Sequence, residues 1–214
     1  MTVAANNTRS ETQPQWRLRT SGPSPFGRKI RMALAAIDRD GDAVIELADT
    51  NDPGDSLRQQ NPLGKIPVLL PNDGPPLFDS KVIVDYLDTV DGRHILVPAG
   101  STRHRALRQQ ALADGILDAA ILQVYESRFR PEEKRHADWL AYQQGKVDRA
   151  LLSFCEDLPD RGDPSPHIGE IALAAALGYL DFRFQGHWRR SHPQLVDWLF
   201  DFAHRFPAYE KTRP

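Results

Sequence analysis

The chain has 214 residues and a formal net charge of −2, with charged residues making up 26% of it. A chain of this length can bury most of its apolar surface in one large or two small domains. It lacks the basic excess typical of nucleic-acid-binding proteins, so no nucleic-acid partner is expected. No apolar run approaches the roughly 20 residues that cross a bilayer, so no membrane partner is expected either.

The N-terminal residues, the single cysteine and the histidines narrow the location and chemistry of the protein. Residues 1–15 are polar and lack the apolar stretch of a secretory signal, so we predict a flexible N-terminal extension there. Cys155 is the single cysteine, which excludes an internal disulfide and favours a cytoplasmic location. The seven histidines show no pairing at metal-ligand spacing, so no metal site is expected.

Strand and helix signals alternate in the first part of the chain. A helix begins at Ser24, because serine is a good N-cap and Pro25 suits the first helical position. Short apolar runs between turn residues predict strands, and apolar residues at helical spacing predict helices. The predicted strands are 16–20, 43–47, 66–70 and 76–78, and the predicted helices lie at 24–40 and around 82–87. A β-α-β unit followed by a hairpin and a helix is the order of a thioredoxin-like domain, which we place at residues 16–90.

The second part of the chain reads as helical throughout. Residues 91–101 are rich in Gly and polar residues and are predicted to form a linker. Beyond it, residues 102–214 form an all-helical domain. Its helices are predicted at 102–129, 131–159, 168–184 and 193–204. The third of these is apolar on almost every face near its start, as expected of a central buried helix. The predicted fold is thus a small α/β domain followed by an all-α domain.

The segment 61–70 (NPLGKIPVLL) carries the most specific signal. Its strand opens on Pro67, which cannot donate a hydrogen bond to a sheet. The Ile66–Pro67 bond is a candidate cis bond, which would turn the backbone of Ile66 outward. Asp79 and Ser80 then stand where the next helix should begin, and the free N–H groups of a helix N-terminus can hold a carboxylate. An open backbone edge beside an anion pocket suggests a small acidic peptide as ligand.

These residues carry a resemblance to a known family. The segments 24–34 (SPFGRKIRMAL), 61–69 (NPLGKIPVL) and 78–80 (FDS) resemble the motifs of the glutathione S-transferase superfamily in order and spacing. The similarity is greatest to branches with a serine in the first motif, such as tau, zeta and related bacterial enzymes. Segment 168–177 (IGEIALAAAL) resembles the buried C-terminal helix of that family, and the whole resemblance covers residues 16–206. It implies glutathione as co-substrate and a two-fold homodimer.

The resemblance implies that Ser24 is the catalytic residue. Its hydroxyl would favour the thiolate of glutathione, the nucleophilic form, by hydrogen bonding at a helix N-terminus. Ser24 could instead be only an N-cap, and Ser21 is a rival donor. Relatives that reduce mixed disulfides carry a cysteine where this chain has Ser24, so conjugation, isomerisation or peroxide reduction is favoured. Cys155 is expected to be a small core residue.

Four residues match the glutathione-holding positions of the family. The backbone of Ile66 would pair with the cysteinyl unit of glutathione, as in strand addition. Ser80 and the helix N-terminus would hold the γ-glutamyl carboxylate, and Asp79 would face its ammonium group. Lys65 is suited to the glycyl carboxylate. A plain helix start and a solvated loop charge remain the alternatives.

Other polar residues fall in the second half of the chain. Asp114, Asp118 and Tyr125 lie near one face of the long predicted helix, and the resemblance places them beside the second-substrate pocket or the dimer axis. A solvent-facing stripe is the alternative. Glu170 is interpreted as half of a capping box, with its partner at His167 or Ser165.

The basic residues at the first predicted helix have a plainer interpretation. Arg28, Lys29 and Arg31 are taken as a solvated helix face.

The sequence therefore predicts a glutathione S-transferase that adds the thiol to a small hydrophobic electrophile, or uses it in isomerisation or peroxide reduction. The alternative is a non-catalytic member of the fold that serves in binding or regulation. The identity of the electrophile stays open, because such pockets are built from variable helical side chains.

Overall fold

The computed structural model describes residues 14–160 and 165–214. Its first part is built on a three-stranded sheet in the order β2-β1-β3. The central strand β1 (Trp16–Thr20) pairs in parallel with β2 (Ala43–Leu47) and antiparallel with β3 (Val68–Pro71). The parallel pair needs a crossover, and helix α1 (Pro25–Ala36) supplies it.

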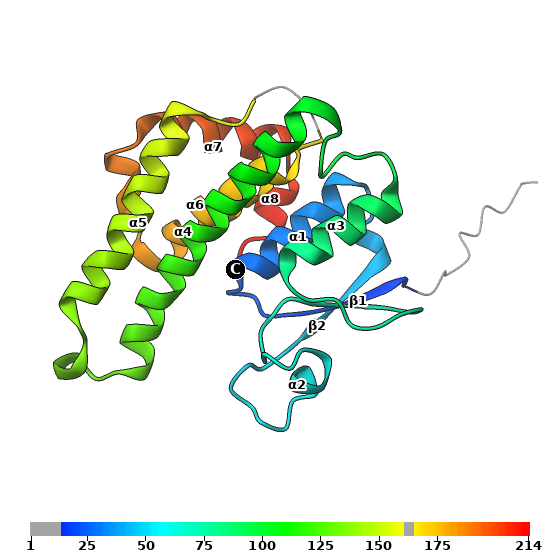
Figure 1. The fold of residues 1–214 in the computed structure, drawn as a ribbon, viewed down its shortest axis with the longest axis horizontal. Helices are drawn as coiled ribbons and strands as arrows, with labels where there is room; N and C mark the ends of the chain where they lie inside the picture. Colours follow the sequence, from blue (N-terminus) through cyan, green and yellow to red (C-terminus); the bar gives the residue numbers. More distant parts are fainter. Residues whose placement is uncertain (1–13, 161–164) are drawn as a thin grey trace, which may run out of the picture.

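Two further helices complete this part of the fold. The short helix α2 (Leu57–Gln60) precedes β3, and helix α3 (Ser80–Asp91) follows β3. Figure 1 shows α1 and α3 between the sheet and the long helices, with α2 on the opposite side of the sheet. The alternation of a mixed sheet and flanking helices is the thioredoxin-like arrangement predicted from the sequence.

Details at the edge of the sheet differ from the sequence prediction. The strand expected at 76–78 is reduced to an isolated bridge between Leu69 and Leu77. β3 begins at Val68, two residues later than predicted and directly after the cis peptide bond Ile66–Pro67. Gln15, assigned from sequence to the extension, donates its backbone N–H to Asp42 at 2.9 Å. The rest of the predicted extension, residues 1–13, lies outside the described residues.

The second part of the chain is helical, as predicted. Its long helices are α4 (Arg103–Phe129), α5 (Ala137–Glu156), α6 (Ile168–Phe184) and α7 (Pro193–Arg205), followed by the short α8 (Ala208–Lys211). Short 3-10 turns lie at Asp40–Asp42, Gly100–Thr102, Glu132–Lys134 and His187–Arg190. None of the helices in the described part of the chain is long and apolar enough to cross a membrane.

Helix α5 starts later than the sequence suggested. Pro131 does not open it; a 3-10 turn follows this proline, and α5 begins after His136. The Nδ1 atom of His136 accepts a hydrogen bond from the backbone N–H of Trp139 at 3.2 Å, which caps the helix. Glu126, near the end of α4, accepts the backbone N–H of His136 at 3.0 Å. This carboxylate therefore joins the two helices at their turn.

Helix α6 forms the centre of the core. It is buried on every face from Ile168 to Leu180 and packs against α4 and α1. Its N-terminus carries the predicted capping box: Glu170 accepts the backbone N–H of His167 at 3.0 Å, and His167 Nδ1 accepts that of Gly169 at 3.0 Å. A single apolar cluster, which includes Leu18 of β1, runs from the sheet to α7. The sheet and the helical part are thus held against each other by shared apolar packing.

The connection between the two parts is fixed by one buried carboxylate. Asp88, near the end of α3, accepts the backbone N–H groups of Leu96 and Val97 at 3.0 and 3.1 Å. Leu96 in turn accepts the backbone N–H of Ile168 at 2.8 Å. The predicted linker 91–101 is therefore tied at its centre both to α3 and to the start of α6.

Candidate functional site

Ser24 stands at the turn from β1 into α1. It is 9% exposed, and its Oγ accepts the backbone N–H of Gly27 at 3.0 Å, so it caps α1. A hydroxyl has one donor hydrogen as well as two acceptor lone pairs. Within the described part of the chain, no hydrogen bond uses that donor hydrogen. Capping and donation are therefore compatible, although they were alternatives at the level of the sequence.

A close approach between β1 and α1 sets the position of this serine. A Cβ atom added to Gly27 would lie 1.8 Å from Oγ1 of Thr20 and 3.3 Å from Oγ of Ser24. Any side chain at this position would therefore push the first turn of α1 away from the end of β1. Glycine lets Ser24 sit directly against the sheet.

The backbone of Ile66 offers an open edge beside the sheet. Ile66 is half-buried and precedes the cis bond to Pro67. Among the described residues, no backbone hydrogen bond involves its N–H or its C=O. Such an unpaired peptide group is what an extended ligand needs for strand addition.

Lys65 lies next to this edge, on a loop whose conformation is held by hydrogen bonds of Asn61. Buried Asn61 donates its side-chain amide to the carbonyl oxygen of Lys65 at 2.8 Å, and its Oδ1 accepts the backbone N–H of Leu63 at 3.0 Å. Gly64 takes a left-handed conformation with φ of 62°, which glycine adopts without steric cost. The side chain of Lys65 is left exposed.

Asp79 and Ser80 form the N-terminus of α3. Asp79 is the N-cap: its Oδ1 accepts the backbone N–H of Lys81 at 2.9 Å and the hydroxyl of Ser80 at 3.4 Å. Its other carboxylate oxygen has no hydrogen bond in the described chain, and the residue is exposed. Ser80 is 5% exposed. A carboxylate able to face a cation thus stands beside N–H groups able to face an anion.

Asp114 does not line an open pocket. It is 3% exposed, and its Oδ1 accepts a hydrogen bond from Nζ of Lys29 at 2.6 Å. The Nζ atom of Lys81 lies 3.9 Å from its Oδ2. The pKa of Asp114 is raised by burial, against the opposing effect of Lys29. This ion pair joins α4 to α1 beneath the start of α3.

Asp118 lies one helical turn after Asp114 and is exposed. The pKa of its carboxyl group is raised, first by partial desolvation and then by the charge of Asp114. The positive charges of Lys65 and Lys81 act in the opposite direction, and Asp79 adds to the rise. The structure therefore brings Lys65, Asp79, Asp114 and Asp118 into one charged cluster, to which Lys81 also belongs.

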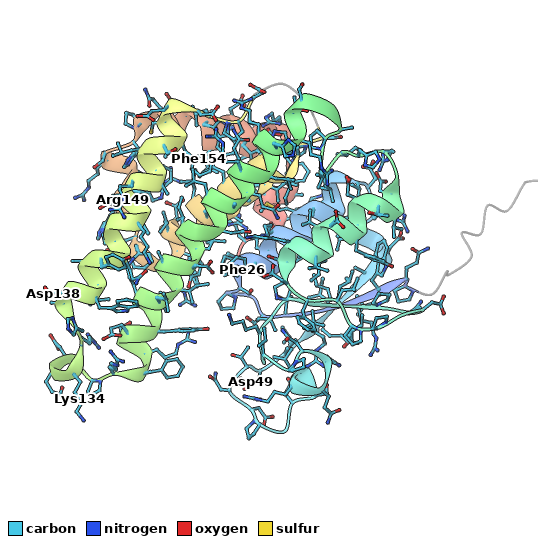
Figure 2. All side chains as sticks on the ribbon, in the orientation of Figure 1. Phe26, Asp49, Lys134, Asp138, Arg149 and Phe154 are labelled. Carbon is cyan, nitrogen blue, oxygen red and sulfur yellow. The ribbon has the colours of Figure 1, made fainter. Side chains whose placement is uncertain are left out.

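Tyr125 lies apart from this cluster. Seven residues along α4 from Asp118 correspond to roughly 10 Å. Tyr125 is 42% exposed and packs edge-on against Phe129, with 5.4 Å between ring centroids. It lines a groove of about 700 Å³ between the end of α4 and the start of α5. Figure 2 shows Asp138, another lining residue, well separated from Phe26 at the start of α1.

The structure overturns the solvated-face interpretation of the basic residues on α1. Arg28 and Lys29 are 4% and 0% exposed. Nη2 of Arg28 donates to the carbonyl oxygen of Tyr209 at 2.8 Å, and its guanidinium lies 4.3 Å from the centroid of the Tyr209 ring. Arg28 and Lys29 are buried because α6 packs along α1, with α8 over Arg28 and Asp114 of α4 against Lys29. Arg31 is half-buried and donates to the backbone carbonyl oxygens of Lys211 and Thr212. Sequence periodicity could not show this packing.

Sequence reasoning also missed the surroundings of Ser24. A cavity of about 10 Å³ beside it is lined by residues that include Arg28, Tyr179 and Pro214. Tyr179 is 5% exposed, and burial raises the pKa of its hydroxyl. Figure 1 places the C-terminus at the start of α1. The one available signal was a tyrosine inside the otherwise apolar run of α6.

Two further expectations concern metal and cysteine. Over residues 14–160 and 165–214, no group of three or more His, Cys, Asp or Glu side chains could hold a metal ion. Cys155 is half-buried on α5 against the main core, and burial raises the pKa of its thiol. A raised thiol pKa opposes formation of the reactive thiolate.

Comparisons with known proteins agree with this architecture. A sequence model described as the glutathione S-transferase N-terminal domain matches residues 23–90. The chain is 32% identical over 196 residues to the uncharacterized GST-like protein YibF of Escherichia coli K12, covering 89% of this chain and 95% of that protein.

Solved structures extend the likeness to the whole fold. A glutathione S-transferase from Methylobacillus flagellatus KT, with GSH bound, is 36% identical with a TM-score of 0.84, covering 93% of this chain and 99% of that one. A glutathione transferase family member from Pseudomonas fluorescens Pf-5, with bound glutathione, is 38% identical with a TM-score of 0.83 and covers 93% and 98%. From these similarities and the arrangement of α1, the cis-proline loop and α3, the chain belongs to the glutathione S-transferase family.

Proposed function

We propose that this protein binds glutathione at the edge formed by Ser24, Ile66 and the N-terminus of α3, and acts as a serine-type glutathione transferase. The observation that carries the proposal is the free donor hydrogen of Ser24 at the end of β1, in the same domain as the unpaired backbone of Ile66. The glutathione bound in the two similar structures supports the choice of ligand.

Each end of glutathione would meet a group of suitable charge. The γ-glutamyl carboxylate would lie at the N-terminus of α3 with Ser80, and its ammonium group would face Asp79. The cysteinyl backbone would pair with Ile66, and the glycyl carboxylate would face Lys65. This arrangement would direct the thiol toward the start of α1, where Ser24 stands.

The chemical task is to ionise that thiol. A free thiol with a pKa of about 8.5 is mostly protonated at neutral pH. The hydroxyl of Ser24 would donate a hydrogen bond to the thiolate, and the α1 dipole would add to the effect. The thiolate would then attack an electrophilic carbon of a small hydrophobic substrate. The carbon–sulfur bond would form as a leaving group departs from that carbon with its electron pair, or as the π bond of an activated alkene opens and the resulting carbanion takes a proton from water. Isomerisation or peroxide reduction by the same thiolate would use the same groups.

The test follows the thiol of bound glutathione in Ser24→Ala. Thiolate absorbance against pH should give a pKa higher by about one unit or more, since a hydrogen bond to a charged group contributes roughly 1.5–3 kcal/mol. Glutathione affinity should change little, because the other contacts remain. Turnover with a generic electrophile should fall in proportion to the lost thiolate.

Two variants separate the chemical role from helix capping. Ser24→Thr keeps a hydroxyl and should keep a low thiol pKa, whereas Ser21→Ala should behave as the unaltered protein. An unchanged titration in Ser24→Ala would reject Ser24, and a shift in Ser21→Ala would assign the role to Ser21. Failure of the unaltered protein to bind glutathione at millimolar concentration would favour the non-catalytic alternative.

We also propose a homodimer in the cytoplasm. The resemblance described above supports the dimer, and the single half-buried cysteine fits a reducing compartment. The second substrate would be small and hydrophobic and would enter beside Ser24, next to Tyr179.

A further inference from the structure

Among the charged residues that the structure describes, Lys29 is the most deeply buried. Its side chain is fully buried in α1, five residues after Ser24. Its Nζ atom lies 2.6 Å from Oδ1 of Asp114 on α4 and 5.3 Å from the centroid of the Phe26 ring. Figure 2 shows Phe26 where α1 meets the long helices. Lys29 therefore crosses from the sheet domain to the helical domain.

The second oxygen of Asp114 extends this pair to α3. Oδ2 of Asp114 is buried and has no hydrogen-bond partner among the described residues. The ammonium group of Lys81 lies 3.9 Å away, within ion-pair distance. Lys81 is also the residue whose backbone N–H is capped by Asp79 at 2.9 Å. One carboxylate thus links α1, α4 and the first turn of α3.

Stability alone does not account for such a pair. Burial lowers the pKa of Lys29 and raises that of Asp114, so each charge costs free energy that its partner offsets. Apolar residues of similar volume often serve as well or better at buried ion-pair sites. The ion pair does fix how α1 and α4 lie relative to each other, because an ammonium and a carboxylate group interact well only in a restricted geometry.

We propose that Lys29 and Asp114 are positioning residues that hold the first turn of α3 against α1 and α4. They would fix Asp79 and Ser80 for the charged end of a γ-glutamyl ligand. The inference rests on the glutathione site proposed above, and it deepens that proposal by assigning a role to two buried residues that cannot touch the ligand. Lys81 is the third member of the set and connects the pair to the helix start.

The principal test is the full-length double variant Lys29→Met/Asp114→Leu. It removes both charges while retaining apolar volume, so the melting temperature should not fall. Glutathione affinity, measured by calorimetry, should nevertheless weaken by about tenfold or more, since a small displacement of a binding group is costly. Amide hydrogen exchange at residues 79–84 should accelerate by about tenfold, with little change in α5 and α7.

Controls separate this effect from loss of fold or loss of charge. Lys134→Met removes an exposed lysine at the far end of the α4–α5 turn and should alter neither measurement (Figure 2). Asp114→Asn is the second variant, for use should the double variant fail to fold, because it keeps the shape of the side chain and removes its charge. In this variant too, glutathione affinity should weaken and exchange at residues 79–84 should accelerate, but the melting temperature should fall because Lys29 is left buried without its charged partner.

The outcomes distinguish this inference from the proposed function. If the unaltered protein binds glutathione and the folded variants bind it equally well, the positioning role is refuted and the proposed function stands. Unchanged exchange at residues 79–84 also refutes it, whatever the affinity. If the unaltered protein does not bind glutathione, the proposed function fails, and this inference about a γ-glutamyl ligand fails with it.

Discussion

At the scale of single residues, two side chains combine a structural role with a chemical one. Ser24 accepts a hydrogen bond to cap α1 and keeps its own hydrogen for donation. Asp79 caps α3 with one carboxylate oxygen and leaves the other without a partner in the described chain. Helix caps occur at the ends of elements, where free N–H groups also collect. The same local geometry therefore serves both the fold and the proposed ligand.

The double role of Asp79 can be resolved by Asp79→Asn. Asparagine caps a helix about as well as aspartate, so the melting temperature should change little. The charge facing the γ-glutamyl ammonium is lost, so glutathione binding measured by calorimetry should weaken by about 1.5–3 kcal/mol.

Asp85→Asn provides the matched control, because Asp85 is exposed in the middle of the same helix. It should leave glutathione affinity unchanged. Equal affinities for Asp79→Asn and the unaltered protein would remove Asp79 from the site.

At the scale of elements, buried carboxylates hold helix ends together. Glu126 accepts the backbone N–H of His136 at 3.0 Å and Nη1 of Arg130 at 2.7 Å. The hydrogen bond from the backbone N–H of His136 is the largest cause that lowers the pKa of Glu126, and the interaction with Arg130 lowers it further. Asp88 plays a comparable part for the linker through Leu96 and Val97. In both cases a buried carboxyl group supplies the hydrogen-bond partners that irregular backbone lacks.

The lowered pKa of Glu126 predicts a pH-dependent contribution to stability. Because the folded-state pKa lies below the unfolded value, the stabilisation is complete above the unfolded pKa. It is lost as the pH falls through the folded pKa. Glu126→Gln should therefore lower the melting temperature at pH 7, and the difference from the unaltered protein should shrink in acid.

Thermal unfolding followed by circular dichroism between pH 7 and pH 3 measures this. Glu133→Gln, at an exposed position in the same turn, should melt as the unaltered protein does at each pH. A difference that stays constant across the range would show that Glu126 acts through its shape and not through its charge.

At the scale of the whole molecule, large apolar side chains exposed to solvent indicate a surface that could contact a second subunit. Leu47 and Leu63 of the sheet domain are 79% and 70% exposed, and Phe129 of the helical domain is 64% exposed. The predicted two-fold dimer would place the first domain of one subunit against the second domain of the other. Side chains of this kind, exposed on both domains, suit such an interface.

A stable dimer should bury on the order of 1,600 Å² of surface or more. Sedimentation equilibrium at micromolar concentration should therefore give twice the mass of the chain. Leu63→Asp should shift the protein toward monomer, since a charge would enter an apolar contact beside Lys65. Phe200→Asp, at a side chain of similar exposure on α7, should not. A monomer for the unaltered protein would refute the dimer and any contact of Asp118 with a partner subunit.

The sequence by itself determined most of the elements and, for several of them, the residue at which they begin. Ser24 and Pro25 predicted the start of α1, Pro67 marked the unusual entry to β3, and the apolar run of α6 identified the central helix. These signals are local: caps, proline geometry and periodicity act over a few residues, so they can be recognised in one stretch of chain.

Only the tertiary structure decided which of these residues meet. Lys29 and Asp114 are 85 positions apart, and neither shows in its own segment that the other will neutralise it. Arg28 and Lys29 of α1 were expected in solvent and are buried, because α6 and α8 pack against α1 and Asp114 of α4 meets Lys29. Tyr125 and Asp118 share helix α4, but Tyr125 lines the groove between α4 and α5 and Asp118 belongs to the charged cluster, because about two helical turns separate them. Contacts of this kind depend on how whole elements pack, and no local pattern encodes that.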